Sequence, residues 1–423
     1  MPPGFVILSR VQQSPTAREI PFRRNLTSFL FCEVCWGFGV SFSSESAILP
    51  VLFRTLGASN LVIGLIPAIS IMASFSQLFA GYFTERRTRT LRFVFWSYTI
   101  GLSFWGLMAL WVFLSPALRA SAAAAISGLL VLFVFLKTFL MFSNAPYAAL
   151  MGRALGNRRG TGYGVIYASN TLAGVFGSLL AAAILGTATA WSGKFALCFA
   201  VTFLCAFTGD LFLFRLEEPP QAPGGHPALW SYIASCAREA WHDRGYRAYA
   251  VGRVCLGVSP ILVYFYVVES GATAARGSLL MAVQTAGACL GILFGGRLGD
   301  RIGFKPIAMA SAVSLAAAMA VMALKPPLAG VIAVAFLAGA FSGLLQSANF
   351  GLIHELSPRA DITAYFSILQ IVLAPVSAAA SLAGGWLIDR TSYGAVLPGA
   401  VVVVLCGVVV WGLRLPRRRP RPS

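Results

Sequence analysis

The sequence predicts an all-α membrane protein whose twelve transmembrane helices form two similar six-helix bundles. The composition is the first reason, because 58% of the 423 residues are hydrophobic and only 11% are charged. Soluble domains carry about 25% charged residues. The other two reasons are the long apolar runs along the chain and the clustering of Lys and Arg between alternate runs.

Each apolar run is long enough to cross a bilayer. A spanning helix needs about 20 mainly apolar residues, because each residue rises 1.5 Å along the helix axis. The boundaries are least sharp where the intervening loops are very short, at 115–122 and 324–328. We predict spans at approximately 27–52, 60–83, 93–115, 122–146, 163–186, 194–214, 248–268, 277–298, 306–324, 328–353, 363–388 and 394–414.

The positions of Lys and Arg predict the orientation of these spans. With the N-terminus in the cytoplasm, 24 of the 32 basic residues fall in cytoplasmic segments, six fall in outer loops and two fall within spans. Cytoplasmic loops carry an excess of Lys and Arg, so this bias places both termini inside. The net charge of +18 is therefore an orientation signal and not a nucleic-acid-binding face. We expect a multi-pass protein of the cell inner (plasma) membrane.

The chain divides into two halves around its longest loop. We expect a cytoplasmic tail at 1–26, a bundle at 27–214, a linker at 215–247, a second bundle at 248–414 and a basic tail at 415–423. Apolar residues recur at helical spacing between Leu229 and Trp241, with charged residues between them. This pattern is typical of an amphipathic helix on the membrane surface, although a plain linker helix fits the same residues.

No cofactor or metal site is expected. Cys32 and Cys35 form a single CxxC pair, but it lies within an apolar run with no second pair and no histidine nearby. We interpret these cysteines as small buried residues rather than a redox or metal pair. The glycines around 160–164 lack the order of a phosphate-binding loop, so no nucleotide site is expected either.

A short motif occurs once in each half. Span two ends with Gly81, followed by Glu85, Arg86 and Arg89, and span eight ends with Gly296, followed by Asp300, Arg301, Gly303 and Lys305. Glycine allows two helices to approach closely, and an acid–base pair at a helix end can bond to neighbouring helix termini. We interpret both copies as cytoplasmic latch motifs that hold one conformation and release in another.

These latch motifs resemble the loop motifs of the major facilitator superfamily. The second copy is close to the family pattern, while the first has Glu85 in place of Asp and lacks the glycine. The Asn144–Leu150 stretch and the segment from Gly384 to Asp389 are also similar to the family. The Gly-Pro motif of drug/proton antiporters is missing from span five. The resemblance implies alternating-access transport, with spans one, four, seven and ten around a central cavity.

Those four spans carry polar and charged residues here. Charge within a span is costly, so each such residue is a functional candidate. The substrate or coupling candidates are Glu33, Ser41, Lys137, Asn144, Tyr147, Arg253, Tyr264, Gln346 and Asn349. For Arg253 an interfacial anchor is the competing interpretation, and Asp210 is interpreted as interfacial. Glu45 and Glu269 are expected near the outer face.

Glu33 and Lys137 are expected to meet. Glu33 lies about 9 Å from the cytoplasmic start of its span, and Lys137 lies about 13 Å from the same surface. We therefore predict that they face each other or share a water-filled cavity. Such a pair could couple transport to protons, or it could be purely structural.

The sequence therefore predicts a monomeric secondary active transporter of a small solute, coupled to protons. Helix breakers at Pro146, Pro260 and Pro375 would allow bending. A non-transporting sensor or assembly factor on the same scaffold is the alternative. A membrane-embedded enzyme is less favoured, because we find no cluster of acids, histidines or metal ligands at one membrane face. The residues favour protons over sodium as the coupling ion, but they determine neither the substrate nor the direction of transport.

Overall fold

The computed structural model describes residues 22–416, apart from 86, 118, 157–158, 221–233, 235–237, 239–240 and 357–361. These residues fold into helices joined by short loops, with no β-strand among them. Most of each expected tail, at 1–21 and 417–423, and most of the expected surface helix between Leu229 and Trp241 lie outside the described residues.

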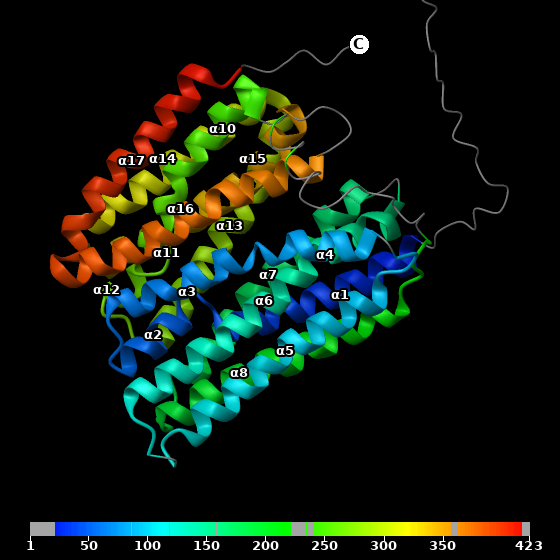
Figure 1. Ribbon diagram of the computed structural model, residues 1–423. Helices are drawn as coiled ribbons and strands as arrows, with labels where there is room; N and C mark the ends of the chain where they lie inside the picture. The colour runs from blue at the N-terminus through cyan, green and yellow to red at the C-terminus, as the bar shows by residue number, and fades with distance from the viewer. Residues whose placement is uncertain are drawn as a thin grey trace, which may run out of the picture.

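The helices form two bundles (Figure 1). The first half contains α1 (Phe22–Val40), η1 (Ser41–Ser43), α2 (Ile48–Thr55), α3 (Asn60–Ala73), α4 (Ser76–Glu85), α5 (Leu91–Leu114), α6 (Ala122–Leu155), α7 (Arg159–Leu185), α8 (Trp191–Leu211) and η3 (Phe212–Arg215). The second half contains α10 (Arg244–Cys255), η4 (Leu256–Val258), α11 (Ser259–Val263), α12 (Tyr266–Glu269), α13 (Ala274–Ile302), α14 (Phe304–Ala323), α15 (Leu328–Leu356), α16 (Ile362–Arg390) and α17 (Tyr393–Arg414).

Eleven stretches of the described chain are long and apolar enough to cross a membrane. They correspond to every predicted span except 60–83, which is divided into α3 and α4. At this division the Ser74 hydroxyl donates to the carbonyl of Ile71 and the Ser76 hydroxyl donates to that of Ala73. Serine side chains that bond to nearby carbonyls compete with the helical hydrogen-bond ladder.

The first span of each half is also interrupted. Span one changes at Ser41 from α1 to η1 and resumes as α2, and the Ser41 hydroxyl donates to the carbonyls of Gly37 and Gly174 at 2.7 and 2.9 Å. Span seven is divided into α10, η4, α11 and α12, with Pro260 in the first turn of α11. Pro146 and Pro375, in contrast, lie inside the uninterrupted helices α6 and α16.

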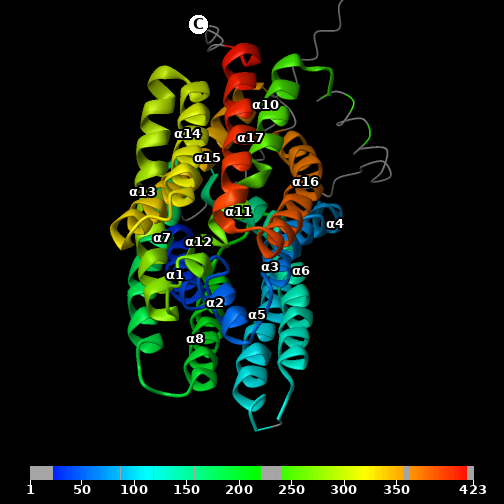
Figure 2. The same ribbon diagram turned by 90° about the vertical axis from the view of Figure 1, so that its left-hand side faces the viewer.

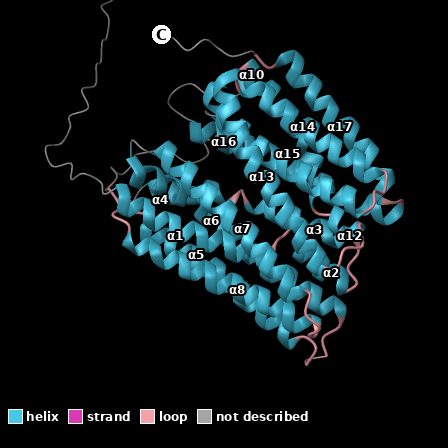
Figure 3. Ribbon diagram, turned by 180° about the vertical axis from the view of Figure 1, so that it is seen from behind, coloured by secondary structure: helices cyan, strands magenta, loops and turns pink. Residues whose placement is uncertain are grey.

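The bundles meet at one end. In Figures 1 and 3 the halves converge around α2, α3 and α12 and diverge toward α4 and α10, and Figure 2 shows α2, α3 and α12 together in front. The Ser381 hydroxyl of α16 donates to the Gly64 carbonyl of α3 at 2.9 Å, across the two halves. We call this the closed end, and the end where α1 begins and α17 finishes is the termini end.

Two ionic contacts join the halves at the closed end. The Arg54 guanidinium in the last turn of α2 forms a 2.9 Å ion pair with Glu269 at the end of α12. The two carboxylate oxygens of Asp389 in α16 accept from the backbone N–H groups of Asn60 and Leu61, each at 2.9 Å. Asp389 therefore caps the N-terminus of α3, where the positive end of the helix dipole favours an anion.

Candidate functional site

A cavity of about 620 Å³ lies between the two halves. Spans one, four and five contribute most of its first-half wall, and broken span seven contributes Tyr264. Discontinuous helices beside a central cavity are typical of transporters, because the interrupted backbone can face polar ligands there. Its polar and charged lining residues are Glu33, Ser41, Ser44, Glu45, Ser46, Tyr98, Lys137, Asn144, Tyr147, Tyr167, Asn170, Thr171, Asp210, Tyr264, Gln284, Thr285, Ser342 and Gln346.

Seven of the nine candidate residues line this cavity. Arg253 and Asn349 are not among its lining residues. Instead, Arg253 of α10 and Tyr249 both donate to the side-chain oxygen of Asn349 in α15. This contact joins two helices within the second half. The candidates that line the cavity are Glu33, Ser41, Lys137, Asn144, Tyr147, Tyr264 and Gln346.

Lys137 forms its ion pair with Glu45, and not with Glu33. The Lys137 ammonium lies 2.6 Å from one carboxylate oxygen of Glu45, and the Ser70 hydroxyl donates to the other at 2.7 Å. The side chain of Lys137 is 9% exposed. The expectation that Glu45 occupies an outer rim is therefore wrong, because the interruption of span one turns this residue into the central cavity.

The length of α6 explains the different partner. The helix continues past the predicted end at residue 146 to Leu155, so Lys137 lies 18 residues from its end. At 1.5 Å a residue, Lys137 is about 27 Å from the termini end rather than about 13 Å. Glu33 is only 11 residues into α1, about 16 Å from that end. The two side chains share the cavity wall at different depths.

Neutral groups hold Glu33. The Tyr147 hydroxyl donates to one carboxylate oxygen at 2.7 Å, and the Asn170 amide donates to the other at 2.7 Å. The same amide also donates to the Glu33 carbonyl at 3.0 Å. Among the described residues, no cation lies within ion-pair distance of this carboxyl group.

Asp210 is another acid of the cavity, and the sequence did not single it out as functional. Its side chain is fully buried at the end of α8 and lines the cavity, so the interfacial interpretation is wrong. The Trp36 ring nitrogen donates to one carboxylate oxygen at 2.7 Å. The other oxygen has no hydrogen-bond partner within the described part of the chain. The sequence signal that could have identified Asp210 as a cavity residue is its position as an acid within an otherwise apolar span.

The latch motifs are only partly described. Arg86 and the side chains of Glu85 and Asp300 lie outside the part of the chain that the structure describes. Gly296 does not mark a close helix approach, because an added Cβ atom would have no neighbour within 4 Å. Lys305 does bond to a helix terminus, donating to the carbonyls of Gly412 and Leu415 at 2.9 and 2.7 Å.

Glu218 makes a helix-end contact that the motifs did not predict. Its carboxylate accepts from the backbone N–H groups of Thr90 and Leu91 at the start of α5, at 2.6 and 3.0 Å. Arg153 near the end of α6 completes the contact with a 3.2 Å ion pair. Glu218 therefore ties the chain after η3 to two helices of the first half, at the termini end.

A sequence comparison decides the family. The sequence profile of the Major Facilitator Superfamily matches residues 30–268 and 248–423 of the chain. The chain belongs to this superfamily. Its fold and its cavity between two bundles agree with that membership, and the family consists of transporters rather than enzymes.

Solved transporters share the fold of this superfamily member. A variant of the nucleoside transporter NupG has a TM-score of 0.65 at 14% identity, covering 93% of this chain and all of the other. A POT family transporter in complex with 5-aminolevulinic acid has a TM-score of 0.70 at 10% identity, covering 92% of this chain and 95% of the other. At such low identity these likenesses show the fold alone.

One characterised relative is similar over a short segment. The tetracenomycin C resistance and export protein of Streptomyces glaucescens is 24% identical over 134 residues. The matched segment covers 31% of this chain and 25% of that relative.

Proposed function

We propose that this superfamily member is a proton-coupled secondary active transporter of a small solute that works by alternating access. One observation carries the proposal: a polar cavity lies between two bundles that are joined by ionic contacts at one end and diverge at the other. Rocking of the bundles about this cavity would expose it to each side of the membrane in turn.

Two carboxyl groups of the cavity, the partly buried Glu33 and the fully buried Asp210, support the choice of the proton as coupling ion. An ionised carboxylate is costly to bury without a cation, and Glu33 and Asp210 are held by neutral donors. Both line the cavity, so opening of either end would change their access to water. Each can therefore bind a proton in one conformation and release it in another. Lys137 is neutralised by Glu45 and is left to contact the solute.

With the basic segments on the cytoplasmic side, the termini end faces the cytoplasm of the cell inner membrane. The conformation described here is then open to the inside and closed to the outside. Closure at the outer end depends on Arg54, Glu269 and Asp389.

The first experiment measures solute flux into proteoliposomes that contain a pH-sensitive dye. The solute panel includes a nucleoside, 5-aminolevulinic acid and tetracenomycin C. We expect wild-type protein to move at least one solute together with protons. In the Glu33→Gln and Asp210→Asn variants, gradient-driven accumulation of solute should fall at least tenfold. Both variants should still exchange solute across the membrane, because the cavity itself persists.

The matched control is Glu217→Gln, which removes an exposed carboxylate outside the cavity. It should accumulate solute as the wild type does. Gradient-driven accumulation at the wild-type level in both Glu33→Gln and Asp210→Asn would contradict proton coupling through these groups. Absence of flux for every solute in the panel would favour the sensor alternative.

A further inference from the structure

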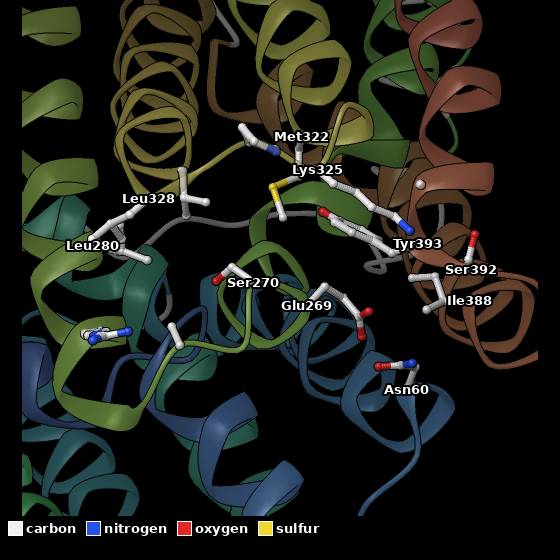
Figure 4. A pocket seen from close by; sticks show the side chains of 15 residues that line it. Asn60, Glu269, Ser270, Leu280, Met322, Lys325, Leu328, Ile388, Ser392 and Tyr393 are labelled. Carbon is white, nitrogen blue, oxygen red and sulfur yellow. The ribbon is translucent and has the colours of Figure 1, made fainter.

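A second pocket lies at the closed end, away from the central cavity. Its volume is about 570 Å³, within the range of small-molecule sites. Figure 4 shows side chains from several helices of the second half around it, with Asn60 of the first half at its edge. Its lining residues are Asn60, Glu269, Ser270, Ala272, Arg276, Leu280, Met322, Lys325, Pro326, Leu328, Val331, Ile388, Ser392, Tyr393 and Gly394.

The pocket has an excess of positive charge. Arg276 and Lys325 both line it, and neither has an ion-pair partner in the described part of the chain. The one acid of the lining, Glu269, is already neutralised by Arg54. Two unpaired cations around one concave space favour an anionic ligand, because the surrounding low-dielectric wall concentrates their field.

Tyr393 supplies an unused hydrogen-bond donor in the same pocket. The residue is only 6% exposed, and its hydroxyl has no hydrogen-bond partner among the described residues. In Figure 4 this hydroxyl points into the pocket toward Met322, and the Lys325 side chain runs along the tyrosine ring, with its nitrogen near the end of the ring opposite the hydroxyl. Buried hydroxyl groups are normally hydrogen-bonded, so a tyrosine without a partner indicates that a ligand or water accepts from it.

The rest of the wall is apolar. Leu280 and Met322 are buried, and Val331 and Ile388 extend the same surface. A bare inorganic anion would make no contact with this apolar wall, whereas a ligand with an apolar body can pack against it.

We propose that this pocket binds an amphiphilic anion, with a carboxylate or phosphate head at Arg276, Lys325 and Tyr393 and an apolar body against Leu280 and Met322. The ligand is either a free organic anion or the headgroup region of an anionic lipid, since both present this chemistry. Because Glu269 and Asn60 belong both to the pocket and to the contacts between the halves, the bound anion stabilises the closed end.

The soluble-ligand experiment uses hexyl phosphate as the probe. The full chain is placed in nanodiscs of phosphatidylcholine, and binding is followed as a saturable rise of the melting temperature. We expect the Arg276→Gln/Lys325→Gln double variant to weaken the apparent affinity at least tenfold. Tyr393→Phe should weaken it severalfold without lowering the melting temperature of the free protein, because it removes only an unpaired buried hydroxyl.

Arg119→Gln is the matched control. Arg119 occupies the short loop between α5 and α6, as Lys325 occupies the loop between α14 and α15, and both residues have φ of 50°. Arg119 does not line the pocket. This variant should bind hexyl phosphate as the wild type does, which separates a defined site from general attraction of anions to cationic loops.

The lipid arm measures retention of phosphatidylglycerol on detergent-purified protein by native mass spectrometry. Retention by the wild type and by Arg119→Gln, but not by the double variant, identifies the lipid as a source even when hexyl phosphate fails to bind. If wild-type protein takes up neither ligand, or the double variant binds both as the wild type does, the proposal is overturned. If Tyr393→Phe binds hexyl phosphate with the affinity of the wild type, the placement of the anionic head of the ligand at the Tyr393 hydroxyl is overturned.

Discussion

At the residue scale, Glu45 defines the centre of the cavity. It binds Lys137 of span four through one oxygen and Ser70 of span two through the other. The interruption of span one makes this arrangement possible, because an unbroken helix would carry Glu45 further along its axis. Lys137 is therefore buried with its charge compensated, and Glu33 is left with neutral partners.

Removing one partner of this pair should cost more stability than removing both. Breaking a buried ion pair costs about 3–5 kcal/mol when the remaining charge has no partner, and less where water reaches the site, as at Glu45. We expect Glu45→Gln to lower the melting temperature of the purified protein. Glu45→Gln/Lys137→Met should recover at least half of that loss, because no uncompensated ammonium remains.

A thermal-melt double-mutant cycle measures this coupling, with Lys137→Met as the fourth corner. If the loss in melting temperature of the double variant equals the sum of the losses of the two single variants, the interaction between Glu45 and Lys137 contributes nothing to stability. Glu217→Gln again serves as the control, since its partner Arg24 is exposed and surface pairs contribute little.

At the element scale, small residues set the distance between helices. A Cβ atom at Gly339 of α15 would clash with the Gln284 carbonyl of α13, and one at Gly37 of α1 would clash with the Asn170 carbonyl of α7. Lipid supplies no hydrophobic drive for helices to associate, so close backbone packing supplies much of the attraction between membrane helices. Carbonyl groups cannot rotate away as a side chain can.

We expect Gly339→Ala to separate α13 from α15 and to cost about 1–3 kcal/mol, the usual range for overpacking. The melting temperature of the purified protein measures it. Gly296→Ala is the matched control in α13, because an added Cβ there meets open space. That control should be neutral or stabilising, since Ala is favoured over Gly in a helix by about 1 kcal/mol. Equal melting temperatures in the two variants would refute the packing argument.

At the scale of the whole molecule, the contacts between the halves are concentrated at the closed end. Arg54 with Glu269 and Asp389 with the start of α3 are contacts between the bundles, and both must break for this end to open. A carboxylate at a helix N-terminus contributes about 0.3–1 kcal/mol. A shift of this size changes a two-state population by up to about fivefold.

We therefore expect Asp389→Asn/Arg54→Gln to raise the population that is open at this end. Spin labels at Arg119→Cys and Leu324→Cys, in a background without the native cysteines, report the distance between the halves in lipid. The double variant should gain a longer-distance component. Glu218→Gln acts within the first half and should leave the distribution unchanged. Identical distributions in the double variant and its parent would exclude these contacts as the closure.

The sequence by itself determined the helical class, the two halves and the family, because these depend on apolar length, loop charge and local motifs. Seven of its nine candidate residues line the cavity, since polar side chains are rare within spans and face one another. Only the tertiary structure decided which charged side chains in the cavity pair with each other. Extension of α6 moved Lys137 away from Glu33, and interruption of span one brought Glu45 to it. Ion pairs depend on depth and helix ends to within a few ångströms, and periodicity along a chain does not contain that information.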